Sequence, residues 1–306
     1  MGEPSSHTVM LDDATRRRLA ERQATCPFVG SLVAEGVLPV CNGADAPLAR
    51  LEDLRVLGNS GGGNLGDLLV LFAAGNHASM DDGTGHIKRP VPAGLFFLGF
   101  PGSQGAHPGH SGILMGDPAT PGSGRFDPDA FARLAALARD GWIRRTDVGH
   151  FIAANLARDP AAKVLGSHVA RLLASDLLDL AESAGSRLWH TLFGGTDDQE
   201  AAHRQMEEKL TRLLGEDNLI GAAGEYGLLF AFLANQPGRR EIDGDPAVDL
   251  DDLVAMFRDK RLPDGWRNWK KTRGDWVVHT TALLLAAARE YLSLRRARRP
   301  ADAPPL

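Results

Sequence analysis

The stretch "DWVVHTTALLLAAAREYLSLRR", from Asp275 to Arg296, decides the fold class. Its apolar residues recur every three to four positions, which is the period of an amphipathic helix. The most apolar part, Val277 to Ala288, contains a histidine and is too short to span a membrane. That histidine, His279, lies on an apolar face, so we expect a core residue rather than a ligand.

The same period recurs through most of the chain beyond residue 126. It predicts helices over residues 127–141, 145–160, 166–193, 199–215, 222–235 and 249–263, and shorter ones over 11–23, 26–36 and 65–75. An alternating strand pattern is present only around "PAGLFFLGF", residues 92–100. We therefore predict an all-α protein with one multi-helix domain.

The predicted domain covers residues 12–295. Residues 1–11 are predicted to be disordered and residues 296–306 to form a flexible tail. Residues 75–125 are rich in glycine, proline and histidine and predict one long irregular loop, which in a compact domain is usually functional. The glycine-rich stretch 57–67 predicts a turn between helices, since no Lys-Ser or Lys-Thr pair follows to make a phosphate cradle.

Composition narrows the function classes. The chain has 306 residues and a net charge of −5 spread along its length, so no basic face for nucleic acid is indicated. No signal peptide or membrane span is recognisable, and we expect a cytoplasmic protein. The two cysteines, Cys26 and Cys41, are then expected to stay reduced rather than to form a disulfide.

Cys26 is the most informative single residue. It precedes Pro27, which suits the first helical position, and Gly36 follows the expected helix end. Free amides and the helix dipole at this position favour a thiolate, which predicts a lowered pKa. Such a thiolate suits a nucleophile, a redox sensor or an axial haem ligand, while the simplest alternative is a small buried apolar residue.

The residues around Cys26 carry a family resemblance. "CPFVGSLVAEGVLP" resembles the proximal haem-ligand motif of the chloroperoxidase and unspecific peroxygenase family. The matching positions are Cys26, Pro27, Leu32, Gly36, Leu38 and Pro39. The chain departs from the motif at Thr25, Gly30 and Glu35, where the family has proline, asparagine and histidine.

Three later stretches fall in the family's order. "GHSGIL" (109–114), followed by "RFDPDAF", resembles the Glu-His-Asp-x-Ser-Leu segment and its downstream Phe-Asn motif. "GEYGLLFAFL" (224–233) is similar to the Tyr-Gly-Glu helix, and "MFRDKRLPDGW" (256–266) resembles the Phe-x-x-Glu-Arg-Leu-Pro-x-x-Gly-Trp signature. The resemblance covers roughly residues 20 to 270.

This resemblance implies a haem-thiolate peroxidase or peroxygenase of the chloroperoxidase type. Haem b would be the cofactor, with Cys26 as the iron ligand beside Pro27 and with hydrogen peroxide and a small organic molecule as substrates. A thiolate ligand favours cleavage of the O–O bond of peroxide. The reaction also needs an acid–base group. His110 matches the family's histidine, Glu182 lies at about the distance expected for the family's glutamate, and Glu225 is a competing candidate.

The resemblance is weaker for two other groups of residues, those that would meet the haem propionates and those that would bind a divalent ion. Lys88 and Arg89 are the basic candidates to meet the haem propionates. The family's structural Mg²⁺ or Mn²⁺ ion is expected to be absent, because Gly109 and Ile113 stand at its ligand positions, unless Asp117 or Asp81 and Asp82 substitute.

Several alternatives stay open. The chain could be a non-catalytic haem sensor or carrier with a degenerate distal site, or a cysteine-nucleophile enzyme without haem. His107 and His110 could bind a non-haem metal, but a third ligand is not evident. The five tryptophans are assigned to packing, although one could line an aromatic substrate pocket.

Overall fold

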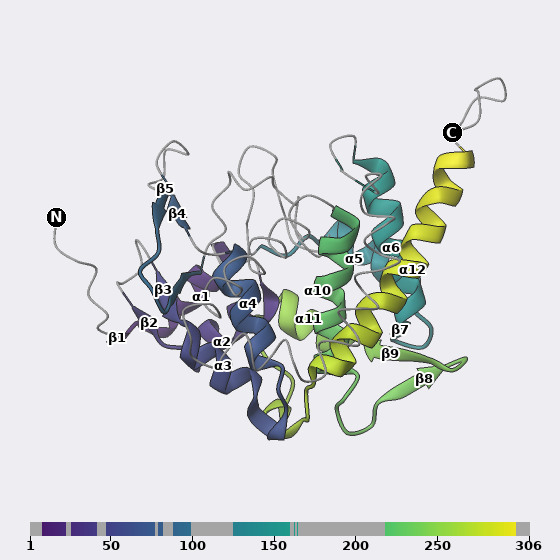
Figure 1. The fold of residues 1–306 in the computed structure, drawn as a ribbon. Helices are drawn as coiled ribbons and strands as arrows, with labels where there is room; N and C mark the ends of the chain where they lie inside the picture. Colours follow the sequence, from purple (N-terminus) through teal and green to yellow (C-terminus); the bar gives the residue numbers. More distant parts are fainter. Residues whose placement is uncertain are drawn as a thin grey trace, which may run out of the picture.

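The computed structural model describes residues 8–22, 26–41, 47–76, 79–81, 88–98, 125–159, 162, 164 and 218–297. This part of the chain is rich in helix, as predicted (Figure 1). Its helices are α1 (Asp13–Arg22), α2 (Pro27–Ala34), α3 (Leu51–Gly58), α4 (Gly66–Asn76), α5 (Pro128–Ala135), α6 (Arg145–Arg158), α10 (Asn218–Leu233), α11 (Leu250–Phe257) and α12 (Arg273–Ala297), with 3-10 turns η1 (Ser60–Gly62) and η2 (Trp266–Asn268).

All these helices except α3 overlap a helix predicted from the periodicity. α3 is two turns long and follows a strand directly, and Arg50 at its N-cap makes no side-chain capping bond. It therefore lacks the start signal by which short helices are recognised. α12 includes the first two residues of the predicted tail. The helices predicted over 166–193 and 199–215 lie outside the described residues.

The prediction of an all-α fold was wrong in one respect, because short antiparallel strands accompany the helices. One sheet has the order β1-β2-β3-β6, a second pairs β4 with β5, and a third has the order β7-β9-β8. The strands are β1 (Thr8–Val9), β2 (Val40–Cys41), β3 (Leu48–Arg50), β4 (Ser79–Asp81), β5 (Lys88–Pro90), β6 (Leu95–Phe97), β7 (Trp142–Arg144), β8 (Arg240–Ile242) and β9 (Asp245–Asp249).

These strands are two to five residues long. A period-two pattern is recognisable only over about four to eight residues, so most of them give no usable signal. β6 lies in the "PAGLFFLGF" stretch, and its Phe96 pairs with Ala49 of β3. β1 lies in the segment predicted to be disordered, where Val9 pairs with Val40. The sheet thus orders the end of that segment.

The centre of the helical part is α12, which packs along both α6 and α10 (Figure 1). Glycines permit the close approach. A Cβ added to Gly149 of α6 would lie 2.7 Å from Ala286 Cβ, and one added to Gly227 of α10 would overlap Thr280 Oγ1. No described helix is long and apolar enough to cross a membrane.

The third sheet fixes the start of α6. Asp245 in β9 accepts hydrogen bonds from the Thr146 amide and hydroxyl, both at 2.7 Å, and pairs with Arg145 at 3.0 Å. His279 Nδ1 lies 3.2 Å from the Arg145 guanidinium. Burial and that positive charge lower the pKa of His279 to about 4. His279 is therefore a neutral core residue, as predicted.

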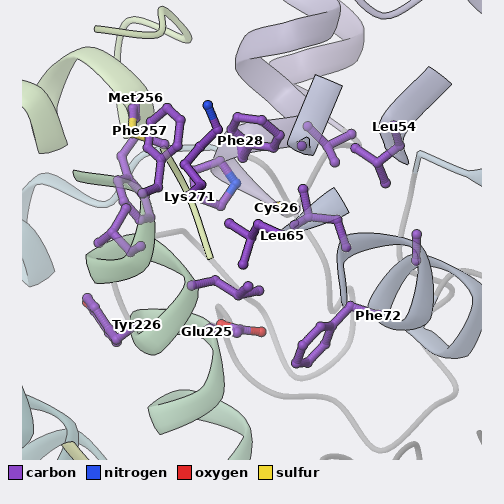
Figure 2. Close-up of a pocket in the computed structure, with 18 of the residues that line it drawn as sticks. Cys26, Phe28, Leu54, Leu65, Phe72, Glu225, Tyr226, Met256, Phe257 and Lys271 are labelled. Carbon is purple, nitrogen blue, oxygen red and sulfur yellow. The ribbon is translucent and has the colours of Figure 1, made fainter. Parts of the chain in front are cut away.

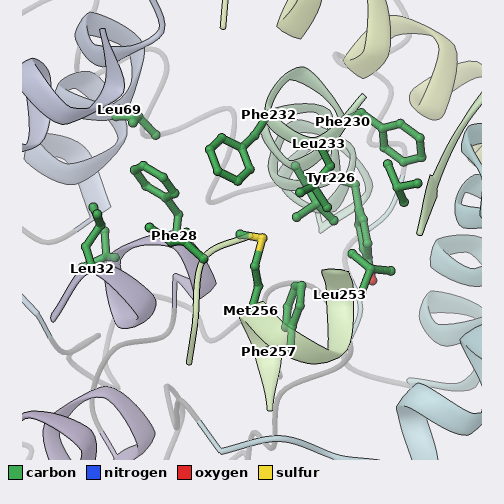
Figure 3. Close-up of a cluster of buried hydrophobic side chains, with 14 of the residues drawn as sticks. Phe28, Leu32, Leu69, Tyr226, Phe230, Phe232, Leu233, Leu253, Met256 and Phe257 are labelled. Carbon is green, nitrogen blue, oxygen red and sulfur yellow. The ribbon is translucent and has the colours of Figure 1, made fainter. Parts of the chain in front are cut away.

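A second region of the core joins α2, α10 and α11 (Figure 3). Phe28 of α2 packs edge-on against Phe232 of α10 with ring centroids 5.2 Å apart, and against Trp266 at 5.7 Å. Ser31 of α2 donates to the Met256 carbonyl at 3.3 Å. These contacts hold the start of α2 beside helices that lie some 200 residues further along the chain.

Candidate functional site

The described part of the chain encloses an apolar pocket with an empty volume of about 1010 Å³, part of it open to solvent. Figure 2 shows side chains from α2, α4, α10 and α11 around it. Phenylalanine and leucine dominate the lining, and the ionisable exceptions are Cys26, Glu225, Tyr226 and Lys271. A concave, mostly apolar pocket with a few polar groups is typical of a substrate or cofactor site.

Cys26 lines this pocket from the N-cap of α2. Its backbone is extended (φ −80°, ψ 119°), and Pro27 occupies the first helical position as predicted. Because Pro27 has no amide hydrogen, the next amides, those of Phe28 and Val29, hydrogen-bond the sulfur. Gly36, with φ of +69°, lies just past the end of α2. Cys26 and Cys41 are both free thiols, so no disulfide joins them.

The expected lowering of the Cys26 pKa is not what the structure gives. Burial raises the pKa of Cys26, and the negative charge of Glu225 raises it further. The Val29 and Phe28 amides and the charge of Lys260 lower it, but they do not compensate for the loss of solvation. The thiol is therefore protonated at neutral pH unless a bound cation stabilises the thiolate, as a ligated metal does.

Glu225 lies in the same pocket on α10. Gly224 and Gly227 on either side of it contact α12, because Trp276 donates to the Gly224 carbonyl at 3.0 Å and Gly227 lies against Thr280. The helix is thereby fixed with its glycines toward α12 and Glu225 at the pocket. Burial and the Glu225 charge together raise the pKa of the neighbouring Tyr226, which stays neutral.

Lys271 closes another part of the wall. Its ammonium donates to the Trp266 and Trp269 carbonyls at 2.9 and 2.8 Å and to Ser60 Oγ at 3.1 Å. The side chain is fully buried, and burial lowers its pKa to about 8. All three N–H groups of the ammonium therefore have acceptors within the protein.

The stretch 57–67 does form the predicted turn between helices, α3 and α4, and it also packs against the Lys271 segment. A Cβ on Gly63 would overlap the Lys271 carbonyl, and Asn64 donates its amide to that carbonyl at 2.9 Å. Close backbone contact explains Gly61 and Gly63, while Gly62 has a positive φ of 74° that favours glycine.

α2 has a second attachment near the pocket. Glu35, which stands where the family motif has histidine, accepts a hydrogen bond from the Leu262 amide at 2.8 Å. Lys260, in the same segment, is buried, and burial lowers its pKa to about 8. Glu21 and Cys26 act in the opposite direction on that pKa.

The predicted site residues divide into three groups. Cys26, Pro27 and Glu225 all line the pocket. His110 and Glu182 lie outside the described residues, as does His107. Lys88 and Arg89 form part of β5, of which only the backbone is described, so their expected role beside the haem propionates stays a prediction.

Sequence reasoning missed two parts of the lining. The aromatic wall of Phe28, Phe72, Phe96 and Phe232 comes from four separate elements, so no local pattern joins them. Lys271 follows a tryptophan-rich turn and has no motif around it. The only sequence signal for Lys271 was indirect. The glycine run in residues 57–67 indicates close backbone contact, but it does not show that the Lys271 segment is the contacting partner.

No group of three histidine, cysteine or acidic side chains that could hold a metal ion occurs within the described ranges. Gly109, Ile113, Asp82 and Asp117 lie outside those ranges, and only the backbone of Asp81 is described. The expected absence of the family's divalent ion therefore stays a prediction.

The pocket has two features that suit a haem, namely a possible ligand for the iron and apolar walls. The sulfur of Cys26 faces this apolar space, and a cysteine sulfur is a soft donor of the kind that haem iron accepts. Lys271 is the one basic side chain among the described lining residues, and its donors are already used. A haem bound here would therefore need partners for its propionates other than the described lining residues.

The chain matches no family model, no curated protein and no solved structure among those with which it was compared.

Proposed function

We propose that this protein is a haem-thiolate peroxidase or peroxygenase that uses hydrogen peroxide to oxidise a small organic substrate. The observation that carries the proposal is the meeting of Cys26 and Glu225 in one apolar pocket. These residues lie almost 200 positions apart in the chain, within two separate stretches that resemble the same family. A thiolate ligand and a carboxylate acid–base group are the two functions that this chemistry requires.

Haem bound at Cys26 would supply the cleavage of the peroxide O–O bond. The protein's own residues have separate tasks. Cys26 would hold the haem iron through Sγ, and the Phe28 and Val29 amides would stabilise the thiolate. Glu225 would move a proton from one oxygen of hydrogen peroxide to the other, so that the second could depart as water, and the haem would supply the two electrons for that cleavage. The phenylalanine and leucine side chains exclude bulk water and hold an apolar substrate.

Glu225 replaces Glu182 and His110 as the acid–base residue in this proposal. Its support is its place in the pocket with Cys26, together with the effect of its charge on the Cys26 pKa, which requires the two groups to lie close together. A carboxyl group in the same pocket as Cys26 is suited to exchange a proton with a substrate bound there.

The first test is haem binding. Purified protein is mixed with haem, reduced and exposed to carbon monoxide, and thiolate ligation is expected to give a strongly red-shifted Soret band. Cys26→Ala should abolish that band. Cys41→Ala is the matched control, because Cys41 is fully buried in β2 and does not line the pocket. Failure to bind haem, or a band unchanged by Cys26→Ala, would overturn the proposal.

The second test separates an enzyme from a haem carrier. Peroxide-driven oxidation of a simple phenol is measured for the native protein, for Glu225→Gln and for Glu241→Gln, whose glutamate is exposed in β8. We expect Glu225→Gln to lower kcat by roughly 10²–10⁴-fold with an unchanged Soret band. A haem complex with no turnover would instead support the sensor or carrier. Turnover that is insensitive to Glu225→Gln would remove its acid–base role.

A further inference from the structure

Trp276 lies directly behind the pocket, although it does not line it. The side chain belongs to the first turn of α12 and is only 8% exposed. Its indole Nε1 donates to the Gly224 carbonyl of α10 at 3.0 Å. Its ring meets the ring of Phe72 of α4 edge-on, with centroids 6.0 Å apart and planes at 77°. Trp276 thus contacts two helices that form different walls.

Both contacts lead straight to pocket-lining residues. Phe72 itself lines the pocket, and Gly224 immediately precedes Glu225. Figure 2 shows the Phe72 ring and the Glu225 side chain directed toward the same part of the pocket. Trp276 also packs in a small cluster with Leu65 and Leu228, which line the pocket as well. The separation between Phe72 and Glu225 therefore depends on the indole behind them.

The hydrogen bond adds a constraint that packing alone does not supply. The Gly224 carbonyl lies within a continuous helix, so the indole bond is additional to the helical pattern. This hydrogen bond fixes the position of α10 along α12 at Gly224, the residue before Glu225. The ring contact meanwhile fills the space into which Phe72 would otherwise turn.

We propose that Trp276 is a specificity-determining residue, which sets the largest uncharged aromatic molecule that the pocket admits beside Glu225. The inference rests on the proposed function in one respect, namely that this pocket receives the substrate. Replacing the indole by a smaller ring removes the bond to Gly224 and leaves space behind Phe72. The Phe72 ring can then retreat, and larger ligands gain contact that small ligands do not use.

The test uses the full-length protein without added haem and two uncharged fluorescent probes, naphthalene and pyrene. Their dissociation constants are measured for the native protein, Trp276→Phe and Phe72→Leu. We expect each variant to raise the affinity for pyrene relative to naphthalene by about fivefold or more. Trp142→Phe is the matched control, because Trp142 lies in β7 and does not line the pocket, and its ratio should be unchanged.

The affinity ratio is informative because a general loss of stability would lower the affinity for both probes by the same factor. If Trp276 acts through Phe72, the two substitutions affect the same contact. The pyrene-to-naphthalene affinity ratio of the double variant should then change by much less than the product of the changes in the two single variants. An unchanged ratio in a folded Trp276→Phe, or fully multiplicative effects, would overturn the inference. Should Trp276→Phe fail to fold, Phe72→Leu alone decides, since an unchanged ratio there removes the means by which Trp276 would act.

The outcome is separable from that of the proposed function. Probe binding requires no haem, so a shifted ratio in a protein that binds no haem would uphold the role of Trp276 and refute the peroxidase. Haem bound by Cys26 with an unchanged probe ratio would do the reverse.

Discussion

Gly227 of α10 lies in close contact with Thr280 of α12, and Gly227→Ala is expected to destabilise the protein by about 2 kcal/mol. The new Cβ would overlap Thr280 Oγ1 and lie 3.0 Å from Thr280 Cβ and 3.1 Å from Thr280 Cα. Rotation of the hydroxyl relieves only the first of these contacts. The helices must therefore separate by a few tenths of an ångström.

The magnitude follows from two opposing contributions. Overpacking a close-packed core costs about 1–3 kcal/mol, and one overlap with two tight contacts places Gly227→Ala near the upper end. Alanine is better than glycine in a helix by about 1 kcal/mol, which offsets part of that cost. Thr280→Ala removes the overlapping oxygen but keeps Cα and Cβ, so the double variant should recover about half of the loss.

Urea unfolding measures these differences through the midpoint, provided that the slope is unchanged. Gly274→Ala is the matched control, because the nearest atom to its new Cβ is Thr272 Oγ1 at 3.7 Å. It should stabilise the protein by up to about 1 kcal/mol. The reasoning is refuted if Gly227→Ala stabilises the protein as much as Gly274→Ala does, or if Thr280→Ala recovers nothing.

Three further predictions concern buried or half-buried polar groups. Asp245→Ala should cost roughly 2–3 kcal/mol in urea unfolding, because Thr146 loses its acceptor and an ion pair is broken; a loss below about 0.5 kcal/mol would contradict this. His279 has a pKa near 4 when folded and about 6.5 when unfolded, so stability should fall by roughly 3 kcal/mol as the pH drops through that window. In unfolding curves measured over a series of pH values, His279→Phe should reduce this loss of unfolding free energy at low pH. The same dependence on pH in the variant as in the native protein would contradict the prediction. Lys271→Met leaves Ser60 and two carbonyls without their donor, so a loss of roughly 2 kcal/mol is expected, with faster amide exchange in the glycine turn; unchanged exchange would contradict it.

The helices were largely predictable, since their signals are local. The spacing of apolar residues placed α6, α10 and α12 within a few residues of their observed bounds. Pro27 and Gly36 likewise marked the two ends of α2. The strands escaped because pairs such as Thr8 with Cys41 bring together short segments from distant parts of the chain. No window of local sequence records which distant segment will supply a partner.

Of the pocket residues, the sequence singled out Cys26 and Pro27 and named Glu225 only as a competing candidate. Cys26 was distinguished by its place before Pro27 and by the motif around it. The presence of Glu225 in the same pocket was not predictable, because it depends on which helix borders the pocket. The phenylalanine wall and Lys271 were missed for the same reason.

The sequence by itself determined where the chain coils into helices and that a cysteine begins one of them, because periodicity and helix ends are properties of neighbouring residues. The tertiary structure placed Glu225 in one pocket with that cysteine and decided in which direction the pKa of Cys26 moves. Local amides favour the Cys26 thiolate, but burial and Glu225 oppose it and prevail. Desolvation depends on everything packed around a group, and most of that packing comes from residues far away in the chain.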